Sequence, residues 1–233
     1  SDLTLKNRYP NVRILTWKKE FNYSAINNFA VREARGEYLL FLNNDVEIIT
    51  ENWLEEMLQL CQQKDVGMVG AKLYYPDDTI QHAGVVVGLG GVAAHVLCKL
   101  PRDAEGYMGR LRCVQEISAV TAACMMVKTS VFKAVGGFDE ELKVAFNDID
   151  LCMKVRKYGV KIVFTPYAEL YHYESKSRGM EDTPEKQLRF SREVNCFRRK
   201  WERELLKGDP YYNPNLTLNN TDCSLRKQEK NGD

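Results

Sequence analysis

The sequence lacks the features that define several large classes of protein. No uninterrupted apolar run reaches the roughly 18 residues that a membrane-spanning helix needs, and no charged segment followed by an apolar one opens the chain. The seven cysteines are scattered, odd in number and free of C-x-x-C pairs, a pattern typical of reduced thiols rather than of a disulfide framework. We therefore expect a cytoplasmic protein.

The chain also has little net charge and lacks a glycine-rich phosphate-binding motif. Its 33 lysines and arginines nearly balance 32 acidic residues, which argues against a protein whose main task is to coat nucleic acid. The glycine-rich segment 84–91 does not fit the nucleotide-binding pattern G-x-G-x-x-G. A nucleotidyltransferase would normally have a glycine-rich phosphate-binding loop near its start, and this sequence has none there, which argues against that class. Hydrophobic residues make up 44% of 233, enough to build a core, so general disorder is excluded.

What the sequence does contain is an alternation of strand and helix patterns. Continuously apolar runs favour strands buried on both faces, and apolar residues at helical spacing favour helices. The predicted strands are 13–17, 38–42, 66–71, 119–127 and 160–164. The predicted helices begin at Ser24, near Asn52, at Thr129 or Ser130, at Asp148 and at Thr183. This alternation predicts an α/β fold with a mainly parallel sheet flanked by helices.

A first candidate site lies directly after the predicted strand 38–42. In open parallel sheets, ligands bind at the carboxyl ends of strands. Asp45, in the segment Asn43-Asn44-Asp45, is therefore well placed to hold a divalent cation. The same three residues also favour an ordinary turn, so this segment alone leaves both interpretations open.

There are two further candidate sites. One is the pair of carboxylates Asp148 and Asp150, and the other is His172. The two carboxylates open a predicted helix, where the helix dipole alone favours acidic residues, and a lone histidine such as His172 is more often structural. Since separate strand ends gather at one edge of such a sheet, we expect Asp45, Asp148 and His172 to converge. A carboxylate oxygen and an imidazole nitrogen suit Mn²⁺ or Mg²⁺ carrying a diphosphate.

Four segments, in order along the chain, resemble motifs of the family-two glycosyltransferases. The first, Gly36–Asp45, is similar to a strand that ends in a D-x-D-type motif, and the second, Gly136–Glu140 with Asn147–Leu151, is similar to G-G-F-D-E and E-D-x-D-L. The third, Tyr171–Gly179, is similar to the family's metal-binding histidine and the loop after it. The fourth, Asp209–Asn215, recurs in the bacterial branch that builds rhamnose-containing and O-antigen polysaccharides. The resemblance covers about residues 22–218. It implies a GT-A fold, a nucleotide-diphosphate sugar donor and inverting transfer to a hydroxyl of a polysaccharide or lipid-linked glycan.

The resemblance also implies roles for single residues near the reaction. Asp45 would be the metal-binding carboxylate, and His172 would complete the metal site. Asp148 would be the catalytic carboxylate, and Asp150 would orient neighbouring groups or the acceptor. Asn147 stands where the family has glutamate.

Donor contacts are implied in the same way. Asn28, Asn43 and Asn44 fall in segments that bind the nucleotide-sugar in the family, and Arg178 would face the donor diphosphate. Asn43 replaces the first acidic residue of D-x-D, which leaves one negative charge fewer for the cation.

One family element has no counterpart at the front of this chain. Family members begin with a strand whose end and following loop hold the nucleotide base. We therefore expect a GT-A domain over residues 1–208 that is N-terminally incomplete, followed by an extended C-terminal tail over 209–233. The alternative is a non-catalytic sugar-nucleotide-binding module or an inactive fragment of a larger glycosyltransferase.

Two further segments carry weaker signals. Gln81-His82-Ala83-Gly84 recurs in the same branch, which makes His82 a candidate for the acceptor pocket. Arg198, Arg199 and Lys200 could touch an anionic membrane at its inner face, since family acceptors are often lipid-linked. So short a basic cluster favours a solvated helix face instead.

Overall fold

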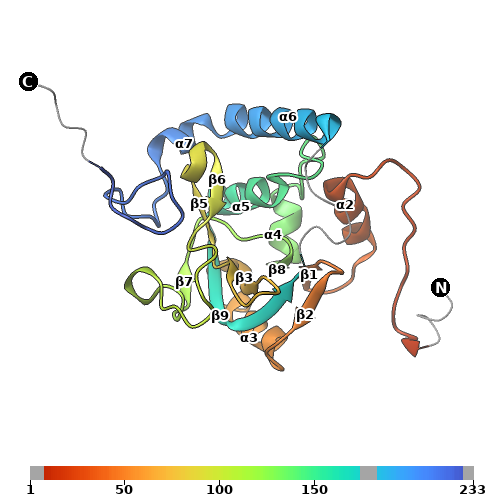
Figure 1. Cartoon of the computed structure of the whole chain (residues 1–233). Coiled ribbons are helices and arrows are strands. Elements are labelled where there is room, and N and C mark those ends of the chain that lie inside the picture. Colours follow the sequence, from red (N-terminus) through yellow and green to blue (C-terminus); the bar gives the residue numbers. More distant parts are fainter. Residues whose placement is uncertain (1–7, 174–182, 228–233) are drawn as a thin grey trace, which may run out of the picture.

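The computed structural model describes residues 8–173 and 183–227, which form an α/β architecture (Figure 1). The helices are α2 (Tyr23–Glu33), α3 (Trp53–Cys61), α4 (Thr129–Ala134), α5 (Asn147–Tyr158), α6 (Pro184–Lys200) and α7 (Glu202–Lys207). Within the described ranges, two short 3₁₀ helices, η1 (Leu89–Gly91) and η2 (Tyr107–Gly109), lie in the loops between strands.

In the described part of the chain, seven strands form the central sheet. They are β1 (Tyr38–Leu42), β2 (Val46–Ile48), β3 (Val66–Tyr74), β4 (Ile80–His82), β7 (Gln115–Glu116), β8 (Cys124–Lys128) and β9 (Lys161–His172). The order along the sheet is β1-β8-β3-β9-β2, with β4 paired to β3 and β7 to β9. A separate hairpin consists of β5 (Val85–Val87) and β6 (Ala93–His95).

The sheet is mixed, which corrects the expectation of a mainly parallel one. β3 and β9 run parallel at its centre, whereas the other pairings described in this sheet are antiparallel. Strand direction could not be predicted because a strand covered on both faces is apolar whichever way it runs. β8 illustrates this, since it is antiparallel to both neighbours yet as thoroughly buried as β3 over most of its length.

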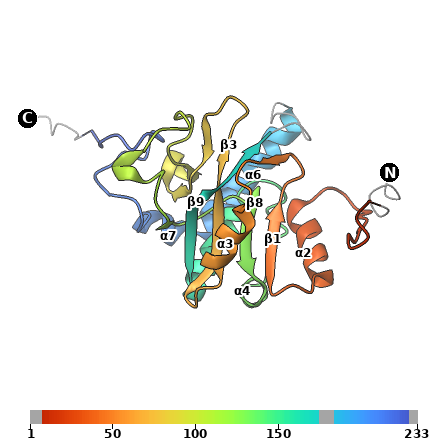
Figure 2. The ribbon, with the colours of Figure 1, turned by 90° about the horizontal axis from the view of Figure 1, so that it is seen from below.

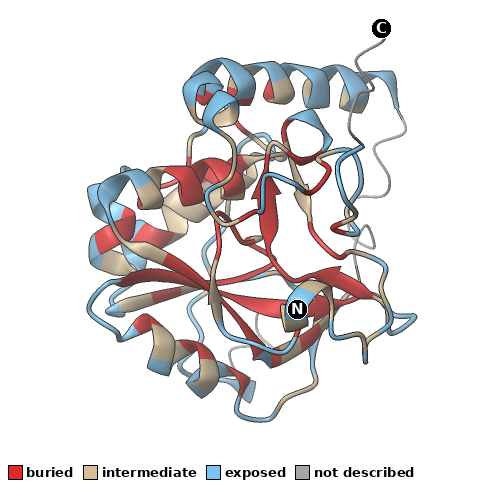
Figure 3. Cartoon of the chain, turned by 90° about the vertical axis from the view of Figure 1, so that its left-hand side faces the viewer, coloured by how far each residue is buried: buried red, intermediate tan, exposed pale blue. Residues whose placement is uncertain are grey.

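Helices cover both faces of the sheet (Figures 1 and 2). On one face, Trp53, Met57 and Cys61 of α3 pack on β3, β8 and β9. On the other face, apolar residues of α4 and α5 such as Phe132 and Leu151 join the larger cluster of buried side chains. Buried residues therefore concentrate in the strands, while the outer helix surfaces are exposed (Figure 3).

Four of the five predicted strands differ in the structure: β3 extends to Tyr74, β8 spans only Cys124–Lys128, β9 extends to His172, and 13–17 forms no strand. β9 continues through Pro166 to His172, because its register against β3 shifts between Gly70 and Lys72 and the proline falls in that irregular stretch. Proline is tolerated there since it need not donate to a regular ladder. Residues 13–17 form no strand in the described pairings, because a β-prone segment needs a partner strand.

The predicted N-cap is confirmed for α6 but is wrong for α2. The Thr183 side chain accepts a hydrogen bond from the Lys186 N–H, and Pro184 occupies the first turn of α6, as predicted. α2 is capped by Asn22 rather than by Ser24. The Ser24 hydroxyl is buried and instead donates to the Leu142 carbonyl at 2.6 Å.

The described C-terminal segment, residues 209–227, packs on the domain instead of extending away from it. The Asp209 carboxylate accepts hydrogen bonds from the Ser118 hydroxyl (2.6 Å) and the Val87 N–H (2.8 Å). Tyr212 and Leu216 are buried. Apolar periodicity did not predict this packing, because the segment has no regular helix or strand and the polar side chain of Asp209 makes several of its contacts.

The basic cluster at the end of α6 is partly used inside the protein. Lys200 Nζ lies 2.5 Å from Asp139 Oδ2 and 2.8 Å from Asp150 Oδ1, and Arg198 donates to the Gly91 carbonyl at 3.2 Å. These contacts favour a structural role over a membrane contact. Within the described ranges, no helix combines the length and the apolar character needed to cross a bilayer.

Candidate active site

The loop between β1 and β2 carries Asn43, Asn44 and Asp45, and neighbouring strands hold it in place. The Asn43 N–H donates to the Ala123 carbonyl (2.9 Å) just before β8, and the Asp45 carbonyl accepts from the Tyr173 N–H (2.8 Å) just after β9. Asn44 is exposed in the turn. Backbone contacts therefore fix the position of Asp45 at the edge where β1 and β9 end and β8 begins.

Asp45 and His172 lie side by side at this edge. Asp45 Oδ1 is 3.4 Å from His172 Nε2, and the two side chains are only 15% and 12% exposed. The antiparallel pairing of Val46 with His172, the last residue of β9, brings the two together. The expected proximity of a carboxylate and an imidazole, far apart along the chain, is thus confirmed.

His172 has two further side-chain partners. Its Nε2 is 3.1 Å from the Asn43 amide nitrogen Nδ2, and its Nδ1 is 2.7 Å from Gln81 Oε1. Gln81 Nε2 also donates to the His172 carbonyl at 3.3 Å. Sequence reasoning did not single out the Gln81 side chain, and its only signal was the recurrence of the segment 81–84.

Asp148 lies in the first turn of α5, near the same edge. Its Oδ2 accepts a hydrogen bond from the Ala122 N–H at 3.2 Å, and its Oδ1 accepts from the N–H of the following residue at 2.8 Å. The side chain remains partly exposed. Because Ala122 directly precedes Ala123, Asp148 and the loop that begins with Asn43 border consecutive residues of one segment.

Asp150 points into the protein instead. It has no exposed surface, and its Oδ1 accepts from Trp201 Nε1 (2.8 Å) and pairs with Lys200 (2.8 Å), while Lys154 lies 3.4 Å from Oδ2. A side chain buried in this way cannot contact an acceptor in this conformation. Of the two expected roles of Asp150, orienting the acceptor is therefore wrong in this conformation, and its contacts agree with orienting neighbouring groups, here α5 and the end of α6.

Asn28 is likewise engaged by the protein. Its Nδ2 donates to the Phe138 carbonyl (2.9 Å) and to Glu140 (3.1 Å), and its Oδ1 accepts from the Phe138 N–H (3.0 Å). Gly137 is required beside it, because its φ is +68° and an added Cβ would lie 2.7 Å from Asn28 Oδ1. Asn28 thus holds the loop before α5, and the predicted donor residue Arg178 lies outside the described residues.

His82 was a candidate for the acceptor pocket, but the structure buries it completely. Its Nδ1 is 3.1 Å from His95 Nδ1, and it has no exposed surface. Burial above all, with the charges of His95 and His172 in addition, holds the pKa of His82 well below its usual range. His82 is therefore a neutral buried residue beside Gln81 and does not line an acceptor pocket in this conformation.

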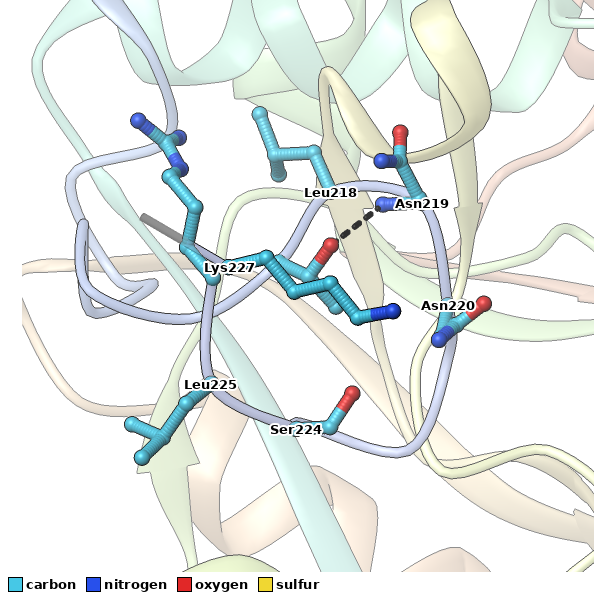
Figure 4. A pocket seen from close by; sticks show the side chains of 8 residues that line it. Leu218, Asn219, Asn220, Ser224, Leu225 and Lys227 are labelled. Atoms are coloured by element: carbon cyan, nitrogen blue, oxygen red, sulfur yellow. Dashed lines mark hydrogen bonds between the residues drawn. The ribbon is translucent and has the colours of Figure 1, made fainter. Parts of the chain in front are cut away.

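A separate pocket lies within the C-terminal loop (Figure 4). The described residues that line it are Thr217, Leu218, Asn219, Asn220, Ser224, Leu225, Arg226 and Lys227. The Asn219 N–H donates to Thr217 Oγ1 at 3.1 Å and helps to shape the loop. This lining includes neither a carboxylate nor an imidazole, so we assign the chemistry to the sheet edge.

The comparison of sequences finds close relatives. A family model described as a glycosyltransferase-like family matches residues 8–193. The chain is 57% identical over 215 residues to the uncharacterized protein y4gI of Sinorhizobium fredii, which covers 92% of this chain and 24% of that protein. It is 42% identical over 225 residues to the O-antigen biosynthesis protein RfbC of Myxococcus xanthus, with 96% and 17% covered. The chain thus spans less than a quarter of these two curated relatives.

More distant similarities point the same way. An N-acetylglucosaminyl-diphospho-decaprenol L-rhamnosyltransferase of Mycobacterium tuberculosis is 24% identical over 197 residues, covering 75% of this chain and 62% of that protein. The mannosyltransferase PcManGT from Pyrobaculum calidifontis, in complex with GDP-Man and Mn²⁺, has a TM-score of 0.59 at 15% identity, covering 87% of this chain and 50% of that one. GalNAc-T7 with UDP, GalNAc and Mn²⁺ has a TM-score of 0.64 at 13% identity, covering 88% and 39%. These structures confirm the GT-A fold.

Proposed function

Because the chain belongs to the glycosyltransferase-like family, we propose that it transfers a sugar, with inversion, from a nucleotide-diphosphate donor to a hydroxyl of a polysaccharide or lipid-linked glycan, using a divalent cation. The observation that carries this proposal is the pairing of Asp45 with His172 at the sheet edge that Asp148 borders. The names of two relatives support the acceptor class, since one concerns O-antigen biosynthesis and the other N-acetylglucosaminyl-diphospho-decaprenol.

The residues at this edge fit a divalent cation. An octahedral ion with ligands at about 2.1 Å has neighbouring ligand atoms about 3 Å apart. Asp45 Oδ1 and His172 Nε2, at 3.4 Å, are close to that spacing, and a mixed oxygen and nitrogen donor set suits Mn²⁺. The two structural neighbours, both of which are complexes with Mn²⁺, agree with this choice.

The donor set is small, which leaves room for substrate. Among the described residues, no group of three or more His, Cys, Asp or Glu side chains could hold a metal ion. Two protein ligands therefore suit a cation that shares its other positions with phosphate and water. When bound, such a cation would stabilise negative charge on the departing nucleoside diphosphate.

Asp148 is the candidate general base. Its carboxylate is partly exposed, and two backbone N–H groups fix its orientation. We expect it to take the proton of the acceptor hydroxyl while that oxygen forms a bond to the anomeric carbon. In the same displacement the bond from that carbon to the nucleoside diphosphate breaks. A base in this role contributes roughly 10²–10⁴-fold to the rate.

The substitution Asp148→Asn tests this assignment. We expect transfer to fall by roughly 10²–10⁴-fold, because an amide cannot accept the proton, while Mn²⁺-dependent donor binding persists. Transfer and donor hydrolysis should be measured with a panel of nucleotide-sugars, in this chain and in any longer protein that contains it.

A matched control is Asp65→Asn, which removes a carboxylate that pairs with Lys161 on the surface. Its rate should equal that of the wild type. Turnover by the Asp148→Asn variant near the wild-type rate would exclude Asp148 as the base. Donor binding by the wild type without any turnover would instead favour a non-catalytic module.

A further inference from the structure

Gln81 makes a two-point contact with His172. It is 4% exposed, and its Oε1 lies 2.7 Å from His172 Nδ1 while its Nε2 donates to the His172 carbonyl at 3.3 Å. The second contact fixes the orientation of the amide, because the carbonyl can only accept. The oxygen end therefore faces the ring, and since that oxygen can only accept, the proton of the neutral imidazole belongs on Nδ1.

The contact on the other side of the ring agrees with this assignment. His172 Nε2 lies 3.1 Å from Asn43 Nδ2, and an amide nitrogen only donates, so Nε2 acts as the acceptor. The neighbouring Asp45 Oδ1 is 3.4 Å away, which is longer than an ordinary hydrogen bond between nitrogen and oxygen. In this assignment the ring lone pair is on Nε2, the nitrogen next to Asp45, where it accepts the hydrogen bond from Asn43.

We propose that Gln81 is a positioning residue that holds His172 in the Nδ1–H tautomer, so that Nε2 is available as a ligand for a divalent cation beside Asp45. This inference rests on the proposed function, in which His172 and Asp45 hold that cation. Histidines that bind metals usually donate their other ring N–H to a carboxylate, a carbonyl or water, which fixes both tautomer and ring orientation. The Gln81 amide supplies such an acceptor without adding negative charge.

A purely structural reading is that Gln81 only ties β4 to the end of β9. The two readings differ in what a substitution does. Gln81→Met keeps the length of the side chain and removes the acceptor, whereas Gln81→Glu keeps an acceptor oxygen. If the contact serves only to join strands, Gln81→Met lowers thermal stability but leaves the His172 tautomer unchanged.

The first experiment reads the tautomer directly from long-range ¹H–¹⁵N NMR spectra of the metal-free chain, at a pH where histidines are neutral. The sequence has three histidines, and His172→Gln identifies the signals of that ring. We expect the Nδ1–H form in the wild type and in Gln81→Glu, and a shift toward Nε2–H in Gln81→Met. An Nε2–H form in the wild type overturns the proposal, even if Gln81→Met fails to fold.

The second experiment measures Mn²⁺ affinity by electron paramagnetic resonance in the presence of a nucleoside diphosphate. Gln81→Met should weaken binding by roughly 10- to 100-fold, as loss of such partners does elsewhere, while Gln81→Glu retains it. Gln59→Met, on the exposed face of α3, is the matched control and should not change the affinity. Unchanged affinity in Gln81→Met overturns the inference alone, whereas a wild type that binds no Mn²⁺ overturns the metal role in the proposed function and this inference with it.

Discussion

Neutral groups, more than opposite charges, orient the side chains of the candidate site. Two backbone N–H groups hold the Asp148 carboxylate, and two amide side chains, Gln81 and Asn43, contact the His172 ring. A lysine or arginine in these positions would compete with a cation for the carboxylates. The arrangement therefore leaves the negative charge of Asp45 and Asp148 for a metal ion and for a proton.

The reactivity of single cysteines tests whether their side chains are buried as the structure describes. Burial raises the pKa of Cys61 to about 11, against smaller opposing effects of Lys128, and raises that of Cys124 to about 12. Since only the thiolate reacts with alkylating reagents, these two should stay unmodified by iodoacetamide at pH 8 until the protein unfolds. Cys113, which is exposed, should react first. Peptide mass spectrometry gives the order, and early modification of Cys61 or Cys124 would contradict the burial.

At the scale of elements, α6 fixes the loop and helix that carry Asp148. The buried Glu193 of α6 accepts hydrogen bonds from the N–H groups of Val144 and Ala145 at 2.9 and 3.0 Å. At the C-terminal end of α6, Lys200 pairs with the buried Asp150 of α5. The position of Asp148 thus depends on contacts at the middle and at the C-terminal end of one long helix.

The role of Asp150 in this interface can be measured through stability. Asp150→Asn removes the negative charge between Lys154 and Lys200, and loss of one partner of a buried pair should lower the free energy of unfolding by about 3 kcal/mol. Asp65→Asn breaks a solvent-exposed pair and should leave the free energy of unfolding close to that of the wild type. Urea unfolding followed by circular dichroism compares them. Equal stability of Asp150→Asn and the wild type would argue against this interface role.

The sequence predicted elements well where one local signal decides the outcome. The apolar run 38–42 became β1, and the cap Thr183 with Pro184 became the start of α6. It failed where partners decide, since the direction of β8 and the absence of pairing at 13–17 depend on which strand lies alongside. Local residue patterns contain little information of that kind.

At the scale of the whole molecule, the site is assembled from segments that are distant in the sequence. The turn after β1, the start of α5 and the end of β9 meet around the residues that lead into β8. The titratable members could be predicted because Asp45 and His172 are conspicuous after apolar strands. Gln81 could not, since its contact with His172 spans 91 residues and a glutamine in a short strand attracts no attention.

The central claim is that Asp45 and His172 together hold a divalent cation that carries a nucleoside diphosphate. Calorimetric titration of UDP or GDP in the presence of Mn²⁺ tests it most directly, with Asp45→Ala, His172→Ala and the surface control Asp65→Ala compared with the wild type. We expect each of the first two changes to weaken Mn²⁺-dependent binding by about tenfold or more, and the control to leave it unchanged. Wild-type affinity in both Asp45→Ala and His172→Ala would contradict the claim.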